Sequence, residues 1–216
     1  PQIADVVDEL ARLRPAEWRR FRVTIFGSAR AKPGTYAYEK VAELARELAA
    51  MGCDVVTGGG PGLMQAANEG ASAAGPPDPD KSVGVRIQLE FEQSTNEFVG
   101  SAYEHRTFFS RLHHFVLLSH AFVVVPGGIG TTLEALMVWQ LLQVQKLTGT
   151  PLIMIGKMWP GLVEWAGDTM LSTDPPLADA ADIEIPRCVD DVAGAVEIIR
   201  GHHDEWAKRR AERTAD

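Results

Sequence analysis

Residues 121–125, AFVVV, form a short apolar run, and PGGIGTTLE follows directly at 126–134. A run this short that is apolar on both faces is typical of a strand in a parallel sheet that helices cover on both sides. Such sheets bind their ligands beyond the carboxyl ends of the strands. A turn that only reverses the chain does not need three glycines, two threonines and a glutamate. The stretch therefore predicts a strand, a turn that holds an anion, and the start of a helix.

The same alternation of apolar run and helical period recurs along the chain. Strand-like runs lie at 21–27, 53–59, 82–89 and 151–156, with a shorter one near 183–186. Helical periods fall at about 3–13, 38–52, 62–75, 132–146, 161–171 and 189–210, and the segment 102–120 is mainly helical. This order predicts an α/β fold, a Rossmann-like doubly wound, mainly parallel sheet with helices on both faces. We expect a single domain over 1–216, with an N-terminal helix within 1–20 and a C-terminal helix and charged tail over 189–216.

Composition narrows the classes of partner. The 216 residues carry a formal net charge of −8, which argues against binding to a nucleic-acid backbone, because that binding needs basic patches. A small anionic ligand is compatible with this charge, since backbone N–H groups bind one without lysines. Cys53 and Cys188 lack the spacing of a metal site, and we predict both as buried thiols in a reducing, cytoplasmic compartment. No run of about 18 apolar residues predicts a membrane span, so we expect no membrane partner. Because the cysteines lack a metal-ligand spacing, we also expect no metal.

A first glycine-rich turn, TGGGPGLM, spans 57–64 between a predicted strand and a predicted helix. Such a turn presents free backbone N–H groups and the positive end of the helix dipole to a phosphate. Its glycines fit neither the dinucleotide-binding G-x-G-x-x-G pattern nor a Walker loop. Gly58, Gly59, Gly60 and Gly62 are therefore either part of an anion-binding site or only the glycines of a tight turn.

The second glycine-rich turn also has two interpretations. Thr131 and Glu134 have the spacing of a capping box, in which the threonine caps the helix and the glutamate folds back to the N–H of the cap. That interpretation needs no chemistry, but it leaves Gly127, Gly128 and Gly130 unexplained. A second anion-binding turn explains the glycines, and a carboxylate in the first helical turn then projects toward the mouth of the sheet.

Between the two turns, HRTFFSRLHHF at 105–115 has the apolar stripe of a helix. Arg111 lies beside that stripe, either at the edge of the buried face or as a solvated arginine whose stem covers apolar surface. His113 and His114 are adjacent, so their side chains point about 100° apart on a helix and do not form an i, i+4 metal pair. We predict that neither histidine binds a metal.

Together, GSAR at 27–30, TGGGPGLMQAANEGA, R-x-F-F-x-R at 106–111 and PGGIGTTLE resemble the LOG family of nucleoside 5′-monophosphate phosphoribohydrolases. The resemblance covers about residues 21–170. The family places a catalytic arginine 23 residues before its motif glutamate, and the same separation joins Arg111 and Glu134. The resemblance implies that these two residues are catalytic. It also implies that Ser28, Thr131 and the glycines of both turns bind the substrate and its phosphate.

The activity that the resemblance implies is hydrolysis of the N-glycosidic bond of AMP or an N6-modified AMP. The products are the free base and ribose 5-phosphate, as in cytokinin biosynthesis, and the family works as a homodimer without a cofactor. A glycosidic transition state resembles an oxocarbenium ion and favours a nearby carboxylate. Glu134 either stabilises that cation, binds the ribose hydroxyls or activates water. Arg111 either holds the phosphate or orients Glu134.

Two departures from the family pattern support other hypotheses. Leu112 stands where the family usually has lysine, and Phe109-Ser110 stands where Met-His is usual. The lost cation favours a nucleotide-binding carrier or sensor of the same fold without turnover, which the intact arginine–glutamate pair opposes. A third hypothesis is a scaffold that uses Glu134 only as a cap. The older label of the family, lysine decarboxylase, finds no support, because a pyridoxal enzyme needs a Schiff-base lysine and these motifs contain none.

Overall fold

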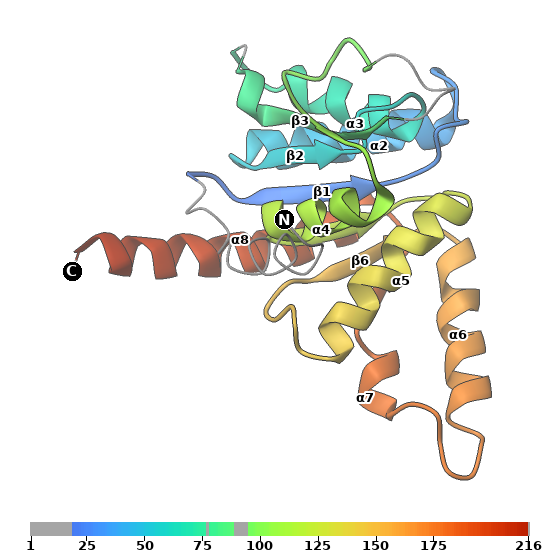
Figure 1. The fold of residues 1–216 in the computed structure, drawn as a ribbon. Helices are drawn as coiled ribbons and strands as arrows, with labels where there is room; N and C mark the ends of the chain where they lie inside the picture. The colour runs from blue at the N-terminus through green and yellow to red at the C-terminus, as the bar shows by residue number, and fades with distance from the viewer. Residues whose placement is uncertain (1–18, 77, 89–94, 216) are drawn as a thin grey trace.

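The computed structural model describes residues 19–76, 78–88 and 95–215, so the helix predicted at about 3–13 lies outside the described residues. The described chain forms one seven-stranded sheet in the order β4-β3-β2-β1-β5-β6-β7, and every pairing is parallel (Figure 1). The strands are β1 (Arg22–Phe26), β2 (Asp54–Thr57), β3 (Ser82–Ile87), β4 (Ser101–His105), β5 (Ala121–Val124), β6 (Leu152–Ile155) and β7 (Pro186–Val189).

Helices cover both faces of this sheet (Figure 1). One face packs against α2 (Tyr36–Ala50), α3 (Leu63–Ser72) and the first turns of α8 (Val192–Ala215). The other packs against α4 (Phe108–Leu118), α5 (Ile129–Gln143) and α6 (Met158–Met170). Two short elements complete the fold, the 3-10 turn η1 (Pro79–Lys81) before β3 and α7 (Ala180–Ile183) before β7. The predicted doubly wound α/β architecture is therefore confirmed.

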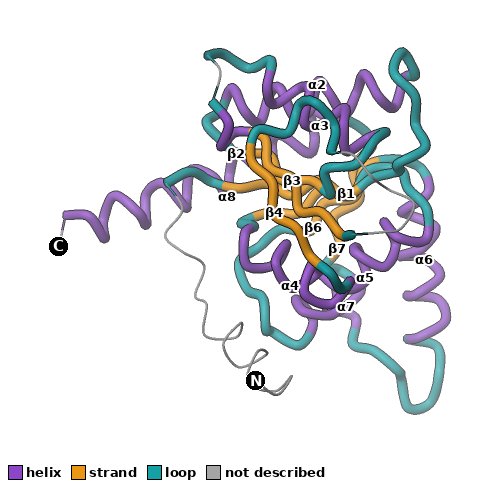
Figure 2. The backbone as a smooth tube through the Cα atoms, turned by 45° about the horizontal axis from the view of Figure 1, so that its top comes forward, coloured by secondary structure: helices purple, strands orange, loops and turns teal. Residues whose placement is uncertain are grey.

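The central strands are buried on both faces, as their short apolar runs predicted. All residues of β1 and β5 are buried, as expected for central strands that are covered on both faces. On α2 the predicted stripe of Val41, Leu44, Ala45 and Leu48 is buried against the sheet. The last turns of α8 project away from the sheet (Figure 2), and they carry the charged sequence predicted for the tail.

Two predictions of secondary structure were only partly right. The segment 102–120, predicted as mainly helix, is helical over Phe108–Leu118, but an edge strand precedes the helix. This strand, 101–105, forms because it pairs with β3 over its whole length, although most of its side chains are exposed. Near 183–186 the chain first forms the helical turn α7, which Asp179 and Asp182 stabilise through a reciprocal capping box. The strand therefore begins only at Pro186.

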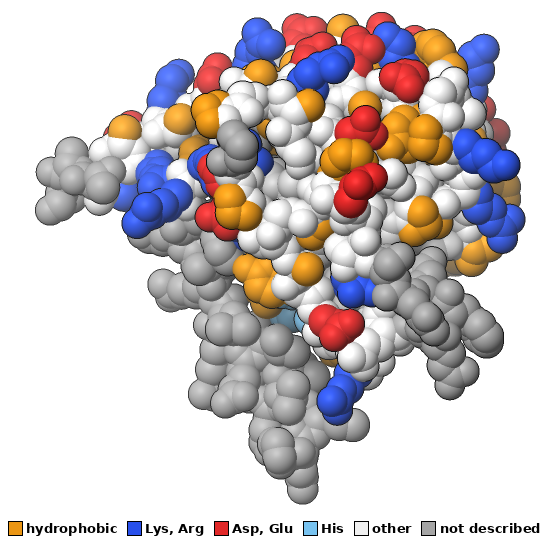
Figure 3. Space-filling model, turned by 90° about the horizontal axis from the view of Figure 1, so that it is seen from above, with side chains coloured by type: hydrophobic (Ala, Val, Ile, Leu, Met, Phe, Trp, Pro, Cys, Tyr) orange, Lys and Arg blue, Asp and Glu red, His pale blue; other side chains and the backbone are white. Residues whose placement is uncertain are grey.

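The two cysteines differ in exposure, and the surface charges are mixed in sign. Cys53 is buried as predicted, but Cys188 is exposed, because β7 is an edge strand with one half-open face. On the face that α2 and α3 cover, acidic and basic side chains are interspersed rather than gathered by sign (Figure 3). Within the described ranges, no helix has the length and apolar character to cross a bilayer.

Candidate functional site

A cavity of about 480 Å³ opens at the carboxyl edge of the sheet, beside the place where the strand order reverses between β1 and β5. Parallel sheets bind ligands at such a switch point, because the loops of the two neighbouring strands diverge to opposite faces. Three turns supply part of the lining: Gly27–Arg30 after β1, the turn that leads into α3, and the turn that leads into α5. The end of β3, the helix α4 and the first turns of α3 and α5 supply the rest.

The turn after β1 is held between the two glycine-rich turns. The Ser28 N–H donates to the carbonyl of Pro126 at 3.1 Å, and the Ser28 carbonyl accepts from the Leu63 N–H at 2.8 Å. The second bond needs Gly62, which has φ +72° and whose missing Cβ would lie 2.3 Å from that carbonyl oxygen. The three turns are therefore one rigid unit around the mouth of the cavity.

A buried amide network holds the first glycine-rich turn, and sequence reasoning missed it. The Asn68 amide oxygen accepts from the Thr57 hydroxyl at 2.7 Å and from the Asn96 amide at 3.0 Å. Asn96 also donates to the Gly60 carbonyl at 2.9 Å, and the Thr57 hydroxyl accepts from the Gly59 N–H at 2.9 Å. The only sequence signal was an asparagine at a position of α3 that packs inward.

The second glycine-rich turn does not form the capping box. Helix α5 begins at Ile129 with Gly128 as its N-cap, and no side chain caps it. Thr131 lies inside the first turn, where its buried hydroxyl packs against the backbone of Gly127. Because Glu134 is then in the second turn, its side chain does not return to the cap. The hypothesis that it is only a cap is wrong.

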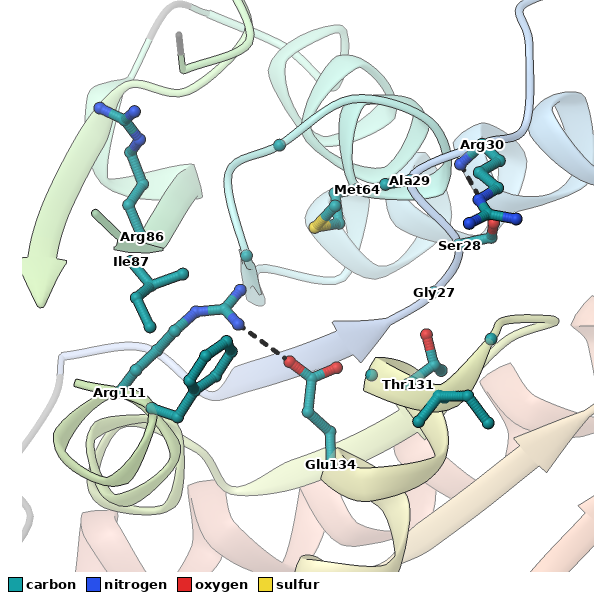
Figure 4. Close-up of a pocket in the computed structure, with 16 residues that line it drawn as sticks. Gly27, Ser28, Ala29, Arg30, Met64, Arg86, Ile87, Arg111, Thr131 and Glu134 are labelled. Atoms are coloured by element: carbon teal, nitrogen blue, oxygen red, sulfur yellow. Dashed lines mark hydrogen bonds and ion pairs between the residues drawn. The ribbon is translucent and has the colours of Figure 1, made fainter. Parts of the chain in front are cut away.

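Glu134 instead meets Arg111 across the cavity (Figure 4). The Arg111 Nη1 atom lies 3.3 Å from Glu134 Oε1, and each side chain is only 12% exposed. The Nε of Arg111 donates to the Val85 carbonyl of β3 at 2.8 Å, and its guanidinium lies 5.2 Å from the ring centre of Phe115. The arginine is thus fixed at the edge of the buried face, one of the two placements that the sequence allowed.

Gly58 makes room for this pair. A Cβ at Gly58 would lie 2.3 Å from Arg111 Nη2, so a side chain there would displace the guanidinium. Burial raises the pKa of Glu134 to about 7, although the Arg111 charge acts in the opposite direction. A carboxyl group that ionises near neutral pH beside a fixed arginine is a suitable participant in acid–base or electrostatic catalysis.

Eight of the eleven predicted site residues line this cavity. They are Ser28, Gly58, Gly60, Arg111, Gly128, Gly130, Thr131 and Glu134. Gly59, Gly62 and Gly127 are not part of the lining. Gly59 packs under the stem of Arg86, Gly62 lets α3 approach Ser28, and Gly127 accommodates Thr131. These three positions are glycine because another part of the protein fills the space of a side chain.

Sequence reasoning missed several residues of the lining. Arg30 and Arg86 add two cations, and apolar side chains come from Met64, Ile87, Phe108 and Ile129. Arg86 and Ile87 end β3, but the strand was predicted to run to residue 89, so no signal in the sequence indicated that these two side chains reach the cavity. No lysine is among the described lining residues, which leaves pyridoxal chemistry without its Schiff-base partner.

The histidines lie outside the cavity lining. His114 Nδ1 lies 2.7 Å from His105 Nε2, and His105 Nδ1 lies 3.1 Å from the Ser110 hydroxyl. Burial lowers the pKa of His114 to about 4, so the ring is neutral at pH 7. In the part of the chain that the structure describes, no group of three or more His, Cys, Asp or Glu side chains could hold a metal ion.

Solved structures of similar fold include two proteins related to the molybdenum cofactor. The molybdenum cofactor carrier protein of Chlamydomonas reinhardtii is 20% identical, with 85% of this chain and 98% of that chain covered and a TM-score of 0.62. The molybdenum cofactor binding protein of Rippkaea orientalis is 17% identical, with 85% and 97% covered and a TM-score of 0.61.

A third solved structure belongs to a protein with a different described function. DNA processing protein A of Helicobacter pylori, described with single-stranded DNA, is 18% identical, with 90% of this chain and 84% of that chain covered and a TM-score of 0.54. Identities of 17–20% show a shared fold and no more. A comparison with curated proteins gives no match.

The family comparison is more specific. A family described as "Possible lysine decarboxylase" matches residues 64–199, which is more than half of the 216 residues. The match includes Arg111, Glu134 and the second glycine-rich turn, the residues that the cavity brings together. The chain therefore belongs to this LOG-like family of possible lysine decarboxylases.

Proposed function

We propose that this protein hydrolyses the N-glycosidic bond of a nucleoside 5′-monophosphate and releases the free base and ribose 5-phosphate. The observation that carries the proposal is the buried pair of Arg111 and Glu134, which faces two glycine-rich turns across one cavity. Its volume of about 480 Å³ is in the range of small-molecule sites. The resemblance to LOG enzymes gives AMP or an N6-modified AMP as the expected substrate and cytokinin production as one use of the reaction.

The 5′-phosphate binds at the start of α5. The first N–H groups of a helix have no partner within the helix and point toward the helix N-terminus, where the helix dipole also favours an anion. Gly128 and Gly130 leave open space at this end, since a Cβ on either would meet no atom within 4 Å. Ser28 and Arg30 lie on the adjacent turn and supply a hydroxyl and a positive charge.

Glu134 acts on the ribose carbon that carries the base. As the bond breaks, positive charge develops on the ribose ring, and an ionised carboxylate stabilises that charge most strongly in a site with little water. Glu134 is the only carboxylate among the described lining residues, so a paired-carboxylate mechanism is not supported. Arg111 is a positioning residue that holds the Glu134 carboxylate and, through Val85, fixes it to the sheet.

The direct test is to incubate the purified protein with AMP, other nucleoside monophosphates and an N6-isopentenyl analogue and to measure released base by chromatography. We expect release by the parent protein and a loss of about 100-fold or more in Glu134→Gln. Arg111→Ala should lose activity as well. Glu197→Gln, an exposed change on α8, is the matched control and should retain the parent rate. A parent protein that releases no base from any nucleotide contradicts the proposal.

The second candidate function is a carrier of a phosphorylated small molecule. Two solved structures of this fold are described as carrying or binding the molybdenum cofactor, and Leu112 replaces a lysine that is usual in LOG enzymes. A carrier binds its ligand in the same cavity and returns it unchanged. Intact nucleotide recovered from a tight complex, with no free base, would favour this function.

We propose that the chain works as a homodimer that pairs through α5. Leu133 and Leu136 are 49% and 44% exposed on this helix, and Ile129 at its start is 88% exposed. Adjacent apolar side chains exposed along one helix are typical of a surface that a partner covers. LOG enzymes pair through helices, which agrees with this placement.

A further inference from the structure

Three arginines are among the described residues of the cavity lining, and they are distributed over its length. Arg111 pairs with Glu134 near the middle. Arg30 lies on the turn after β1, near the proposed phosphate position, and Arg86 lies on the opposite side, at the end of β3 (Figure 4). A nucleotide whose phosphate is at the start of α5 and whose ribose is at Glu134 extends its base toward Arg86. The arginine is therefore placed to contact the base.

The surroundings of Arg86 hold its stem and leave its charge weakly paired. The stem packs against Gly59, whose missing Cβ would lie 3.1 Å from Arg86 Cγ. Among the described residues, the ion pair of Arg86 is with Glu104 on β4, whose Oε1 lies 3.8 Å from Nη1, and this glutamate is half exposed. An ion pair this long and this open contributes little energy. The guanidinium thus has donors available for a ligand.

The described lining offers few side-chain acceptors for an amino group on a base. Glu134 already accepts from Arg111, and the Ser28 hydroxyl accepts from the Arg30 N–H at 3.1 Å. The Thr131 hydroxyl is buried against Gly127. The Glu104 carboxylate pairs with Arg86 but is not among the lining residues, so the exocyclic amino group of adenine, a donor, meets no side-chain acceptor of the described lining at the Arg86 end. A carbonyl oxygen on the base, by contrast, can accept a hydrogen bond from the Arg86 guanidinium.

We infer that Arg86 recognises the base and selects a 6-oxopurine, whose O6 and N7 acceptors match the two parallel donors of a guanidinium. The preferred substrates are then IMP and GMP rather than the AMP that the family resemblance implies. This inference rests on the proposed function for the orientation of the nucleotide. The residue sets specificity and does not act on the bond that breaks.

The test compares kcat/KM for IMP, GMP and AMP in the parent, Arg86→Met and Arg86→Lys. The parent should prefer IMP and GMP over AMP by about 10-fold or more, the range of a bidentate arginine contact. Arg86→Met should reduce that ratio to about one. Arg86→Lys keeps the positive charge but lacks the two parallel N–H donors of the guanidinium, so it should recover only part of the ratio. Arg30→Met is the matched control, which should lower all three values together and leave the ratio unchanged.

The outcomes separate this inference from the proposed function. If AMP is hydrolysed as well as IMP, or if the ratio survives in Arg86→Met, the inference is wrong and the hydrolase function stands. If no nucleotide releases base, the hydrolase function fails, and dissociation constants for IMP, GMP and AMP measured by calorimetry decide the inference. Tighter binding of IMP and GMP that Arg86→Met removes supports it. Equal binding of the three nucleotides overturns it.

Discussion

Glu134 is a residue for which folding and chemistry have opposite requirements. Burial stabilises its neutral form and raises its pKa to about 7, whereas the proposed reaction needs the carboxylate. The rate should therefore rise with pH through 7 and level off above it, with about a tenfold change per unit below the pKa. Measuring kcat/KM from pH 5 to 9 checks this. A rate that is highest at pH 5 would show that the protonated carboxyl is the active form.

The same pKa predicts how stability changes with pH. The carboxyl keeps its proton up to about pH 7 in the folded protein but releases it near 4.5 when unfolded. Its contribution to stability is therefore fully present below 4.5 and is lost as pH rises through 7. Glu134→Gln does not ionise, so its melting temperature should rise relative to that of the parent as the pH increases from 5 to 8. A difference that is constant over this range would contradict the raised pKa.

Two glycines of the site should respond differently to alanine. Gly62→Ala places a side chain at φ +72° and against the Ser28 carbonyl, so it should destabilise the fold by about 2 kcal/mol or more. Gly130→Ala meets no atom within 4 Å and lies in α5, where alanine is favoured by about 0.5–1 kcal/mol. It should therefore preserve or raise the melting temperature. Urea unfolding measures both effects, and equal losses would contradict the distinction.

At the residue scale, chemistry could be predicted better than selectivity. The spacing of Arg111 and Glu134 and the family resemblance predicted a pair that the structure brings to 3.3 Å. Arg86 could not be identified, because its place in the cavity depends on β3 lying next to β2 in the sheet. Gly59 and Gly62 were predicted to touch ligand, but sequence does not tell a glycine that faces a ligand from one that faces protein.

At the scale of elements, the Asn68 network is the support of the first glycine-rich turn. Asn68→Ala removes the acceptor of Thr57 and Asn96 and the donor to Ser82. Buried groups left without partners should lower the free energy of unfolding by about 3 kcal/mol. Chemical denaturation measures this loss, and KM for the nucleotide should rise with it.

The control for this change is Asn96→Ala. Asn96 is only partly buried, so water replaces its amide, and the loss of stability should be smaller. Equal losses in the two variants would show that burial of the network is not what stabilises the turn.

Prediction of elements succeeded where one physical signal dominates. β5 is a continuous apolar run and β1 is a mostly apolar one, each is followed by a glycine-containing turn, and both were identified. β4 was missed, because an exposed edge strand is formed by backbone pairing with β3 and has no apolar alternation of its own. The start of α5 was ambiguous for a similar reason, since threonine and glutamate at capping-box spacing also suit a helix that glycine caps.

At the scale of the whole molecule, α5 has both a buried and an exposed apolar side. Ala135 and Val138 are buried against the sheet, whereas Leu133 and Leu136 face outward. If the outward side forms the dimer, Leu133→Asp combined with Leu136→Asp should give a monomer by light scattering. Leu177→Asp, at a 71% exposed position outside α5, is the matched control and should leave the mass of the parent. A parent protein that is already monomeric would contradict the proposal.

The bond between Arg111 and the Val85 carbonyl has a consequence for how such a protein can change over evolution. The acceptor is a peptide group, which is present whatever side chain stands at that position. The neighbouring positions Arg86 and Ile87 can therefore vary without releasing the arginine from the sheet. A library randomised at these two positions should yield active enzymes with altered substrate choice. The residues proposed to break the bond are held by the backbone of β3, whereas the base would be recognised by side chains that can change independently.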